Sequence, residues 1–145
     1  MGLLFMRVAY LALFAVALAA ATSAAAAQIV ARISLSDQSM RVLIDGWPRY
    51  TWKVSNALRG YVTPVGVYRA QRLEEMWYSR KYEMSPMPHS IFFNGGYAIH
   101  GTYYIKRLGT RASHGCVRLH PDNAATLYSL VRQNGMQNVQ IIVSQ

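Results

Sequence analysis

The chain has 145 residues, a formal net charge of +9 and a single cysteine. This length suits one domain, and one cysteine excludes a framework of internal disulfides. So basic a chain favours anionic surroundings, which for an exported protein means a cell-wall polymer or anionic lipid rather than nucleic acid, although solubility alone would also account for the charge.

Residues 1–27 have the pattern of a secretory signal peptide. Arg7 is the only charged residue before Arg32, an apolar run covers residues 8–20, and small residues lead to Ala27. A basic start, a short apolar segment and an A-x-A cleavage site are typical of such peptides. We therefore expect export to the periplasm or cell wall and cleavage near Ala27. An uncleaved membrane anchor is the alternative.

Residues 28–145 are expected to form one domain, mostly β with one or two helices. Alternating apolar side chains predict a strand over 29–35. A hairpin is predicted over 40–54 with its turn at Asp45-Gly46, since an Asp-Gly pair between two strands favours a tight turn. A short strand is predicted over 67–70.

Residues 71–90 show no regular period and are interrupted by Pro86 and Pro88. We predict a long irregular loop, of the kind that often serves as a lid or binding loop in compact domains. Its aromatic and methionine side chains would then line a cleft; the alternative is that they only cap the core. These side chains are Trp77, Tyr78, Tyr82, Met84 and Met87.

The C-terminal part continues with a hairpin, a helix and a closing strand. Asn94-Gly95-Gly96 separates two apolar runs and predicts a tight hairpin whose second strand ends at His100. Pro121 is placed to begin a helix whose apolar residues recur at helical spacing, and Gly135 is placed to end it. Alternation over 139–143 predicts the last strand.

The only cysteine, Cys116, is the candidate nucleophile, and His100 is its candidate base. A thiol reacts as its thiolate, which a nearby imidazole can generate and hold. His100 ends one strand and Cys116 follows a connection back toward the same sheet, so we expect antiparallel neighbours to bring the two side chains together. Gly115 would let a substrate carbonyl approach backbone N–H groups that act as an oxyanion hole, and Gly101 would leave a carbonyl free to orient the imidazole. This chemistry is acyl transfer through a thioester.

Four other interpretations remain open for these residues. The cysteine can be inert core packing, or His114 can be its base, because residues two apart in a strand share a face. A zinc site is the rival chemistry, although the paired ligand spacing of structural zinc sites is missing. A wall-binding module without enzymatic activity is the last. The zinc ligands would be drawn from His100, His114, Cys116 and His120.

Three segments resemble the YkuD-type L,D-transpeptidase family. They are Ile99-His100-Gly101-Thr102, Ser113-His114-Gly115-Cys116-Val117-Arg118-Leu119 and Thr63-Pro64-Val65-Gly66-Val67-Tyr68. The third is similar to the family's Thr-Pro-x-Gly-x-aromatic segment. The resemblance covers the chain from about Ile29 to Val143, and it implies an L,D-transpeptidase-like mixed β-sheet sandwich that works without a metal or organic cofactor.

The resemblance also implies roles for individual residues. Cys116 would be the nucleophile, His100 the general base, and Gly101 the source of the carbonyl that orients it. The residues expected to shape the oxyanion pocket are Ser113, His114 and Gly115. Those expected to contact substrate are Arg118, implied by the resemblance, and Trp77, Tyr82 and Tyr97.

The reaction implied by the resemblance acts on peptidoglycan. Members of the family cleave the bond between an L-centre and the terminal D-residue of a tetrapeptide stem, and they pass the acyl group to an amine or to water. The amine would belong to another stem, to a free D-amino acid, or to an outer-membrane protein or lipoprotein. The resemblance also implies that carbapenems acylate the cysteine. No nucleic-acid partner is expected.

Overall fold

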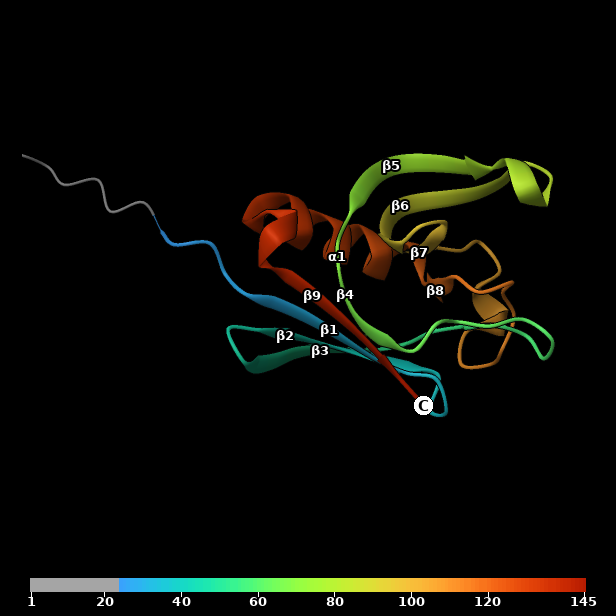
Figure 1. Cartoon of the computed structure of the whole chain (residues 1–145), viewed down its shortest axis with the longest axis horizontal. Helices are drawn as coiled ribbons and strands as arrows, with labels where there is room; N and C mark the ends of the chain where they lie inside the picture. The colour runs from blue at the N-terminus through green and yellow to red at the C-terminus, as the bar shows by residue number, and fades with distance from the viewer. Residues whose placement is uncertain (1–23) are drawn as a thin grey trace, which may run out of the picture.

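The computed structural model describes residues 24–145, in which two β-sheets face each other with one helix at their side (Figure 1). Most of the expected signal peptide, residues 1–23, lies outside the described residues. The folded body takes in Ala27, whose backbone N–H donates to Asn134 Oδ1 at 2.8 Å and which packs against the core. Within the described range, no helix is both long and apolar enough to cross a membrane.

The larger sheet has five strands in the order β3-β2-β1-β9-β4. β1 and β9 run parallel, and the other neighbours are antiparallel. The predicted turn is confirmed, because Asp45 and Gly46 join β2 to β3 with φ of 50° and 81°, as a tight hairpin turn requires. The strands are β1 (Ile29–Ser34), β2 (Ser39–Ile44), β3 (Trp47–Lys53), β4 (Gly66–Arg69) and β9 (Val139–Ser144).

The smaller sheet has four strands in the order β5-β6-β7-β8. They are β5 (Arg72–Ser79), β6 (Ser85–Asn94), β7 (Tyr97–Gly101) and β8 (Val117–Leu119). β5, β6 and β7 are antiparallel in turn, and the predicted tight connection between β6 and β7 is confirmed. The expectation that His100 and Cys116 lie on antiparallel neighbours is wrong, because β7 and β8 are parallel. The connection after β7 crosses over, so the chain re-enters the sheet in the same direction.

The prediction of an irregular loop over 71–90 is also wrong. β5 and β6 form a long hairpin, with the 3-10 helix η1 (Arg80–Tyr82) at its tip (Figure 1). Met87 and Phe92 belong to one apolar cluster although their odd separation should place them on opposite faces. His89, with φ of 52°, lies between them and interrupts the alternation. The regular alternation that identifies a strand is therefore interrupted in β6, and the sequence does not show it.

The helix α1 (Pro121–Asn134) begins and ends where the sequence predicts. His120 Nδ1 accepts a hydrogen bond from the backbone N–H of Asp122 at 3.2 Å, and Gly135 follows the last turn with φ of 85°. Its buried residues pack mainly against β6 and β7. Two further 3-10 helices are η2 (Ile105–Arg107) and η3 (Met136–Asn138). From residue 24 to the C-terminus the fold is thus mostly β with one α-helix, in agreement with the predicted class.

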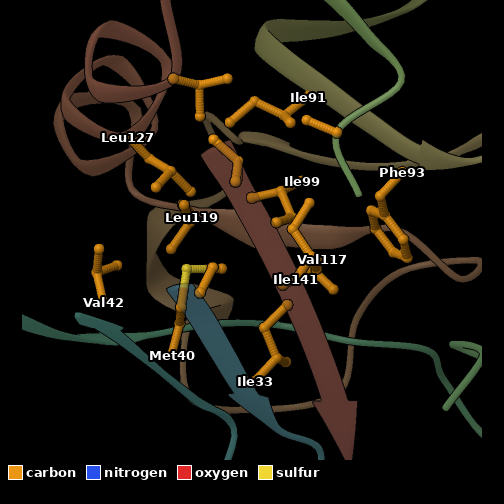
Figure 2. Close-up of a cluster of buried hydrophobic side chains, with 14 of the residues drawn as sticks. Ile33, Met40, Val42, Ile91, Phe93, Ile99, Val117, Leu119, Leu127 and Ile141 are labelled. Atoms are coloured by element: carbon orange, nitrogen blue, oxygen red, sulfur yellow. The ribbon is translucent and has the colours of Figure 1, made fainter. Parts of the chain in front are cut away.

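One apolar core fills the space between the sheets, as Figure 2 shows. The larger sheet contributes Ile33, Met40, Val42 and Ile141, the smaller sheet Ile91, Phe93, Ile99, Val117 and Leu119, and the helix Leu127. Side chains of successive residues in a strand point to opposite faces, so the residues next to the core positions of the smaller sheet point to its outer face. Those residues are Phe92, Ala98, His100, Cys116 and Arg118.

Candidate active site

A pocket of about 620 Å³ opens on the outer face of the smaller sheet. His100, Cys116 and Arg118 line it, so the alternation of β7 and β8 brings together the three residues that the sequence singled out. The β5–β6 hairpin forms a further part of its wall. Of the five side chains named for the 71–90 segment, Trp77, Tyr82 and Met87 line the pocket, whereas Tyr78 and Met84 are exposed outside it.

Cys116 immediately precedes β8 and is half-buried. Its neighbour Val117 pairs with Ile99, so Cys116 lies beside Ala98. It packs on the cluster of Met87, Phe92 and Ala98, with its sulfur 3.9 Å from Gly96 O. Burial raises the pKa of the Cys116 thiol, while a backbone hydrogen bond from Ala98 and the charge of Arg118 act in the opposite direction. The resting group is therefore the neutral thiol.

His100 is nearly buried, with 5% of its surface exposed. Its Nδ1 lies 2.6 Å from the carbonyl oxygen of Gly101. A carbonyl only accepts, so Nδ1 carries the hydrogen and Nε2 keeps its lone pair. Burial lowers the pKa of His100 to about 4; the bond to Gly101 raises it and the charge of Arg118 lowers it. The imidazole is therefore neutral near pH 7 and able to take up a proton at Nε2.

His100 and Cys116 are diagonal neighbours on parallel strands. His100 pairs with Arg118, and Cys116 precedes Arg118 by two residues, which puts it on the same face. Ordinary sheet dimensions place their α-carbons about 8 Å apart, a span that an imidazole and a thiol can bridge. The arrangement thus gives one pocket a proton donor, the thiol, and a preoriented proton acceptor.

The loop before the cysteine is held by two hydroxyl groups. Ser113 Oγ donates to Cys116 O at 2.6 Å and accepts from the N–H of Gly115 at 3.0 Å. Thr63 Oγ1 donates to Gly115 O at 2.8 Å and accepts from the N–H of Ala57 at 3.1 Å. The sequence motif gave Thr63 no role; its hydroxyl ties the Thr-Pro-x-Gly segment to the cysteine loop.

Gly115 is required by its conformation and by its neighbours. Its φ is +139°, and an added Cβ would lie 2.5 Å from Tyr97 Cε1 and 2.8 Å from Val62 O. Its N–H is engaged by Ser113, whereas the N–H groups of His114 and Cys116 have no hydrogen-bond partner among residues 24–145. Tyr97, expected to contact substrate, lines the pocket and also supports this glycine.

His114 is held between two tyrosine rings. Tyr82, from the hairpin tip, stacks on it at 4.2 Å between centroids, and Tyr61 approaches edge-on at 4.6 Å. Aromatic pairs of this kind contribute about 0.5–1.5 kcal/mol each beyond their buried area. The ring therefore joins the hairpin to the cysteine loop, and this contact supports a structural role for His114.

Arg118 is held in place by both its backbone and its side chain. Its N–H and C=O bond to Ser55 at 2.9 and 3.0 Å, and its Nη1 donates to Ala112 O at 3.2 Å. Burial lowers the pKa of Arg118, but an arginine stays charged at neutral pH. Gly101, on the other strand, gives room for the helix start, since an added Cβ would lie 3.2 Å from Pro121 Cα.

The pocket has a strongly cationic lining that sequence reasoning missed. Besides Arg118 it includes Arg72, Arg80 and Lys81, and among the residues described none of its lining groups is a carboxylate. No grouping of three or more potential metal ligands occurs within 24–145, so the rival zinc set is not assembled there. One of its members, His120, instead caps the helix.

Comparisons with known proteins agree with this geometry. The chain matches the family model YkuD, described as the L,D-transpeptidase catalytic domain, over residues 28–141. The L,D-transpeptidase from Mycobacterium smegmatis is 23% identical with a TM-score of 0.71, over 82% of this chain and 59% of that one. The enzyme from Stackebrandtia nassauensis is 25% identical with a TM-score of 0.72, over 81% and 56%.

A third solved structure is L,D-transpeptidase 3 from Mycobacterium tuberculosis in complex with a faropenem-derived adduct, 20% identical with a TM-score of 0.69 over 82% of this chain and 61% of that one. The chain thus spans less than two thirds of the length of these three proteins. No curated protein matches it. Because the family match covers most of the chain and takes in both His100 and Cys116, the protein belongs to the YkuD family and contains its L,D-transpeptidase catalytic domain.

Proposed function

We propose that the protein is a cysteine-dependent L,D-transpeptidase acting on the tetrapeptide stems of peptidoglycan. The observation that carries the proposal is the shared pocket of Cys116 and His100, in which Gly101 O fixes the imidazole with its Nε2 lone pair available. Family membership supports the substrate class, and the cationic lining suits a peptide that carries several carboxylates.

The first half-reaction forms an acyl-enzyme. His100 Nε2 takes the proton from Cys116 Sγ as the sulfur attacks the carbonyl carbon of the stem's L-centre. The oxyanion that forms accepts hydrogen bonds from the N–H groups of His114 and Cys116, each such donor being worth about 3–4 kcal/mol in related sites. The intermediate then collapses: the C–N bond breaks, His100 returns its proton to the departing amine, and the terminal D-residue leaves.

The second half-reaction reverses these roles with a new amine. The acceptor amine attacks the thioester carbonyl, gives its proton to His100, and displaces Cys116, which regains a proton. A second stem, an amine of an outer-membrane protein or lipoprotein, a free D-amino acid or water would each complete the same cycle. The N-terminal sequence and the basic composition support the further proposal that this occurs outside the cytoplasm, in the periplasm or cell wall.

The test is incubation of the purified protein with a disaccharide-tetrapeptide, followed by mass spectrometry. A crosslinked dimer, a D-amino-acid exchange product and a shortened stem have distinct masses, so the spectrum identifies the acceptor as well as the reaction. We expect at least one of these products from the wild-type protein and none from Cys116→Ala, which should keep the wild-type circular dichroism spectrum. Products from Cys116→Ala, or none from the wild type, would contradict the proposal.

A second readout uses β-lactams of the carbapenem and penem type. A faropenem-derived adduct is part of one structurally similar L,D-transpeptidase. We expect the intact mass of the wild-type protein to increase by one inhibitor molecule and that of Cys116→Ala to stay unchanged. Labelling of the variant would place the reactive group elsewhere.

A further inference from the structure

Arg72 is a cation in the pocket that the acyl-transfer steps do not use. Its guanidinium lies over the Phe92 ring, 3.9 Å from the centroid, and over the Trp77 ring at 4.5 Å. Its Nη1 donates to Glu74 Oε1 at 2.7 Å. Two ring faces and one carboxylate therefore hold the group in a single orientation, which lowers the entropy cost of binding a ligand.

The Arg72 guanidinium has N–H groups that are left to bind a ligand. It carries five, and within residues 24–145 only Nη1 has a hydrogen-bond partner. Glu74 does not line the pocket, whereas Arg72 does, and 42% of the Arg72 side chain is exposed. The remaining donors form a fork that matches a carboxylate.

Strand register fixes where this fork lies relative to the nucleophile. Arg72 pairs with Phe92, Phe92 pairs with Ala98, and Cys116 lies beside Ala98, so the four residues form one row across the sheet. Because the guanidinium sits over Phe92, it is two strand spacings from Cys116, which is about 10 Å.

The row between the sulfur and the guanidinium is apolar. It is formed by the cluster of Met87, Phe92 and Ala98, against which Trp77 packs. A ligand that spans it therefore needs a methylene chain with an anion at its end. In a stem whose third residue is a diamino diacid such as diaminopimelate, the side-chain carboxyl carbon is about 7–8 Å from the carbonyl that Cys116 would attack. With the added length of a carboxylate–guanidinium contact, an extended side chain covers the separation of about 10 Å that follows from the strand spacing.

We propose that Arg72 binds the side-chain carboxylate of the third residue of the donor stem and thereby selects diamino-diacid stems. The inference rests on the proposed function for the position of the attacked carbonyl. A lysine at that position lacks the side-chain carboxylate, and amidation of the diaminopimelate side chain removes the negative charge of that carboxylate. Glu74 is a positioning residue, because it acts by holding the guanidinium.

The experiment measures equilibrium binding to protein carrying Cys116→Ala, so that no chemistry is needed. The ligands are disaccharide-tetrapeptides with diaminopimelate, its side-chain amide, or lysine as third residue. We expect the diaminopimelate stem to bind roughly ten- to a hundred-fold more tightly than the other two, as a charge-assisted, forked contact allows. Adding Arg72→Gln should reduce this ratio to near one.

Arg80→Gln is the matched control, since it removes a cation of the same pocket from the hairpin tip rather than from the row. It should leave the ratio unchanged, whereas Arg72→Lys should keep part of it. A ratio that survives Arg72→Gln, or that is near one in the Cys116→Ala parent, overturns the proposal. A fourth ligand, the diaminopimelate stem with an amidated terminal D-residue, tests whether Arg72 binds the carboxylate of the terminal residue instead. If Arg72→Gln abolishes discrimination against that ligand instead, Arg72 binds the leaving group and the proposal is wrong.

These outcomes are independent of the proposed activity. A wild-type protein that binds diaminopimelate stems through Arg72 but turns none of them over would contradict the proposed function while leaving the role of Arg72 supported. Turnover of all stems with equal kcat/KM would do the reverse.

Discussion

The substitution Thr63→Val tests whether the cysteine loop is held by a remote hydroxyl. Thr63 is 4% exposed, and its Oγ1 serves the Ala57 N–H and the Gly115 carbonyl at once. Valine keeps the shape and leaves both groups without a partner. Each buried group left unpaired costs about 1–3 kcal/mol, so for the two groups we expect the free energy of unfolding to fall by about 2–6 kcal/mol.

Chemical denaturation measures this loss, and a thermal melt should show a fall of roughly 10 °C. Turnover should also fall, because the residue after Gly115 is Cys116. Thr63→Ser keeps the hydroxyl and should retain most of the stability and activity. Thr51→Val, on the exposed strand β3, is the control for the substitution itself and should change stability by less than about 0.5 kcal/mol. Equal stability of Thr63→Val and wild type would refute the reasoning.

Three further predictions follow from the same site. The raised pKa of Cys116 means that its alkylation by iodoacetamide should be slow at pH 7 and still accelerating above about pH 8.5, the ordinary thiol pKa; a plateau below pH 7 would instead reveal a resting ion pair. His100→Ala should slow transfer at least about a hundred-fold, and near-wild-type turnover would move the base to His114. Tyr82→Ala removes the stack on His114 and should raise KM by roughly three- to ten-fold, whereas Tyr78→Ala, outside the pocket, should not. Equal KM values for the two variants would show that the hairpin tip does not control substrate access.

The buried imidazole also makes stability depend on pH. The pKa of His100 is about 4 in the folded protein, below its ordinary value of 6.5, so the unfolded chain binds the proton first as pH falls. His100 therefore favours the folded state above pH 6.5, and this contribution, roughly 3 kcal/mol, is lost between pH 6.5 and 4. Denaturation of wild type and His100→Gln over this range should show a steeper loss in the wild type. Parallel profiles would contradict a depressed pKa.

Local signals in the sequence were sufficient to predict turns and helix ends wherever one residue type fixes the backbone conformation. Asp45-Gly46 predicts its turn because both positions need positive φ, and Pro121 and Gly135 bound the helix for equally local reasons. The pairing of His100 with Cys116 in one pocket was also predicted, from the chemistry that a thiol requires. The turn and the helix ends depend on residues close together in the sequence, and the pairing of His100 with Cys116 follows from the need of a thiol for a base.

What the sequence concealed depends on contacts between distant segments. Pro86 and Pro88 suggested a loop, yet both lie where β6 is paired with β5 alone and its other edge needs no N–H donor. The direction in which β8 joins β7 is set by the crossover and leaves no trace in either strand. No sequence pattern marks Arg72, because its two aromatic neighbours become close only when the hairpin forms.

The alternation of β7 and β8 has a consequence for how this protein can diverge. Ile99 and His100, Cys116 and Val117, and Arg118 and Leu119 are consecutive pairs in which one residue faces the core and the other the pocket. A single-residue insertion or deletion in either strand would exchange the two sets and lose stability and activity together. The β5–β6 hairpin meets the rest of its sheet along one edge only, so its tip can lengthen or shorten without that exchange. Descendants of this chain should therefore differ most in hairpin length and least in the spacing within each of the two segments 98–101 and 116–119.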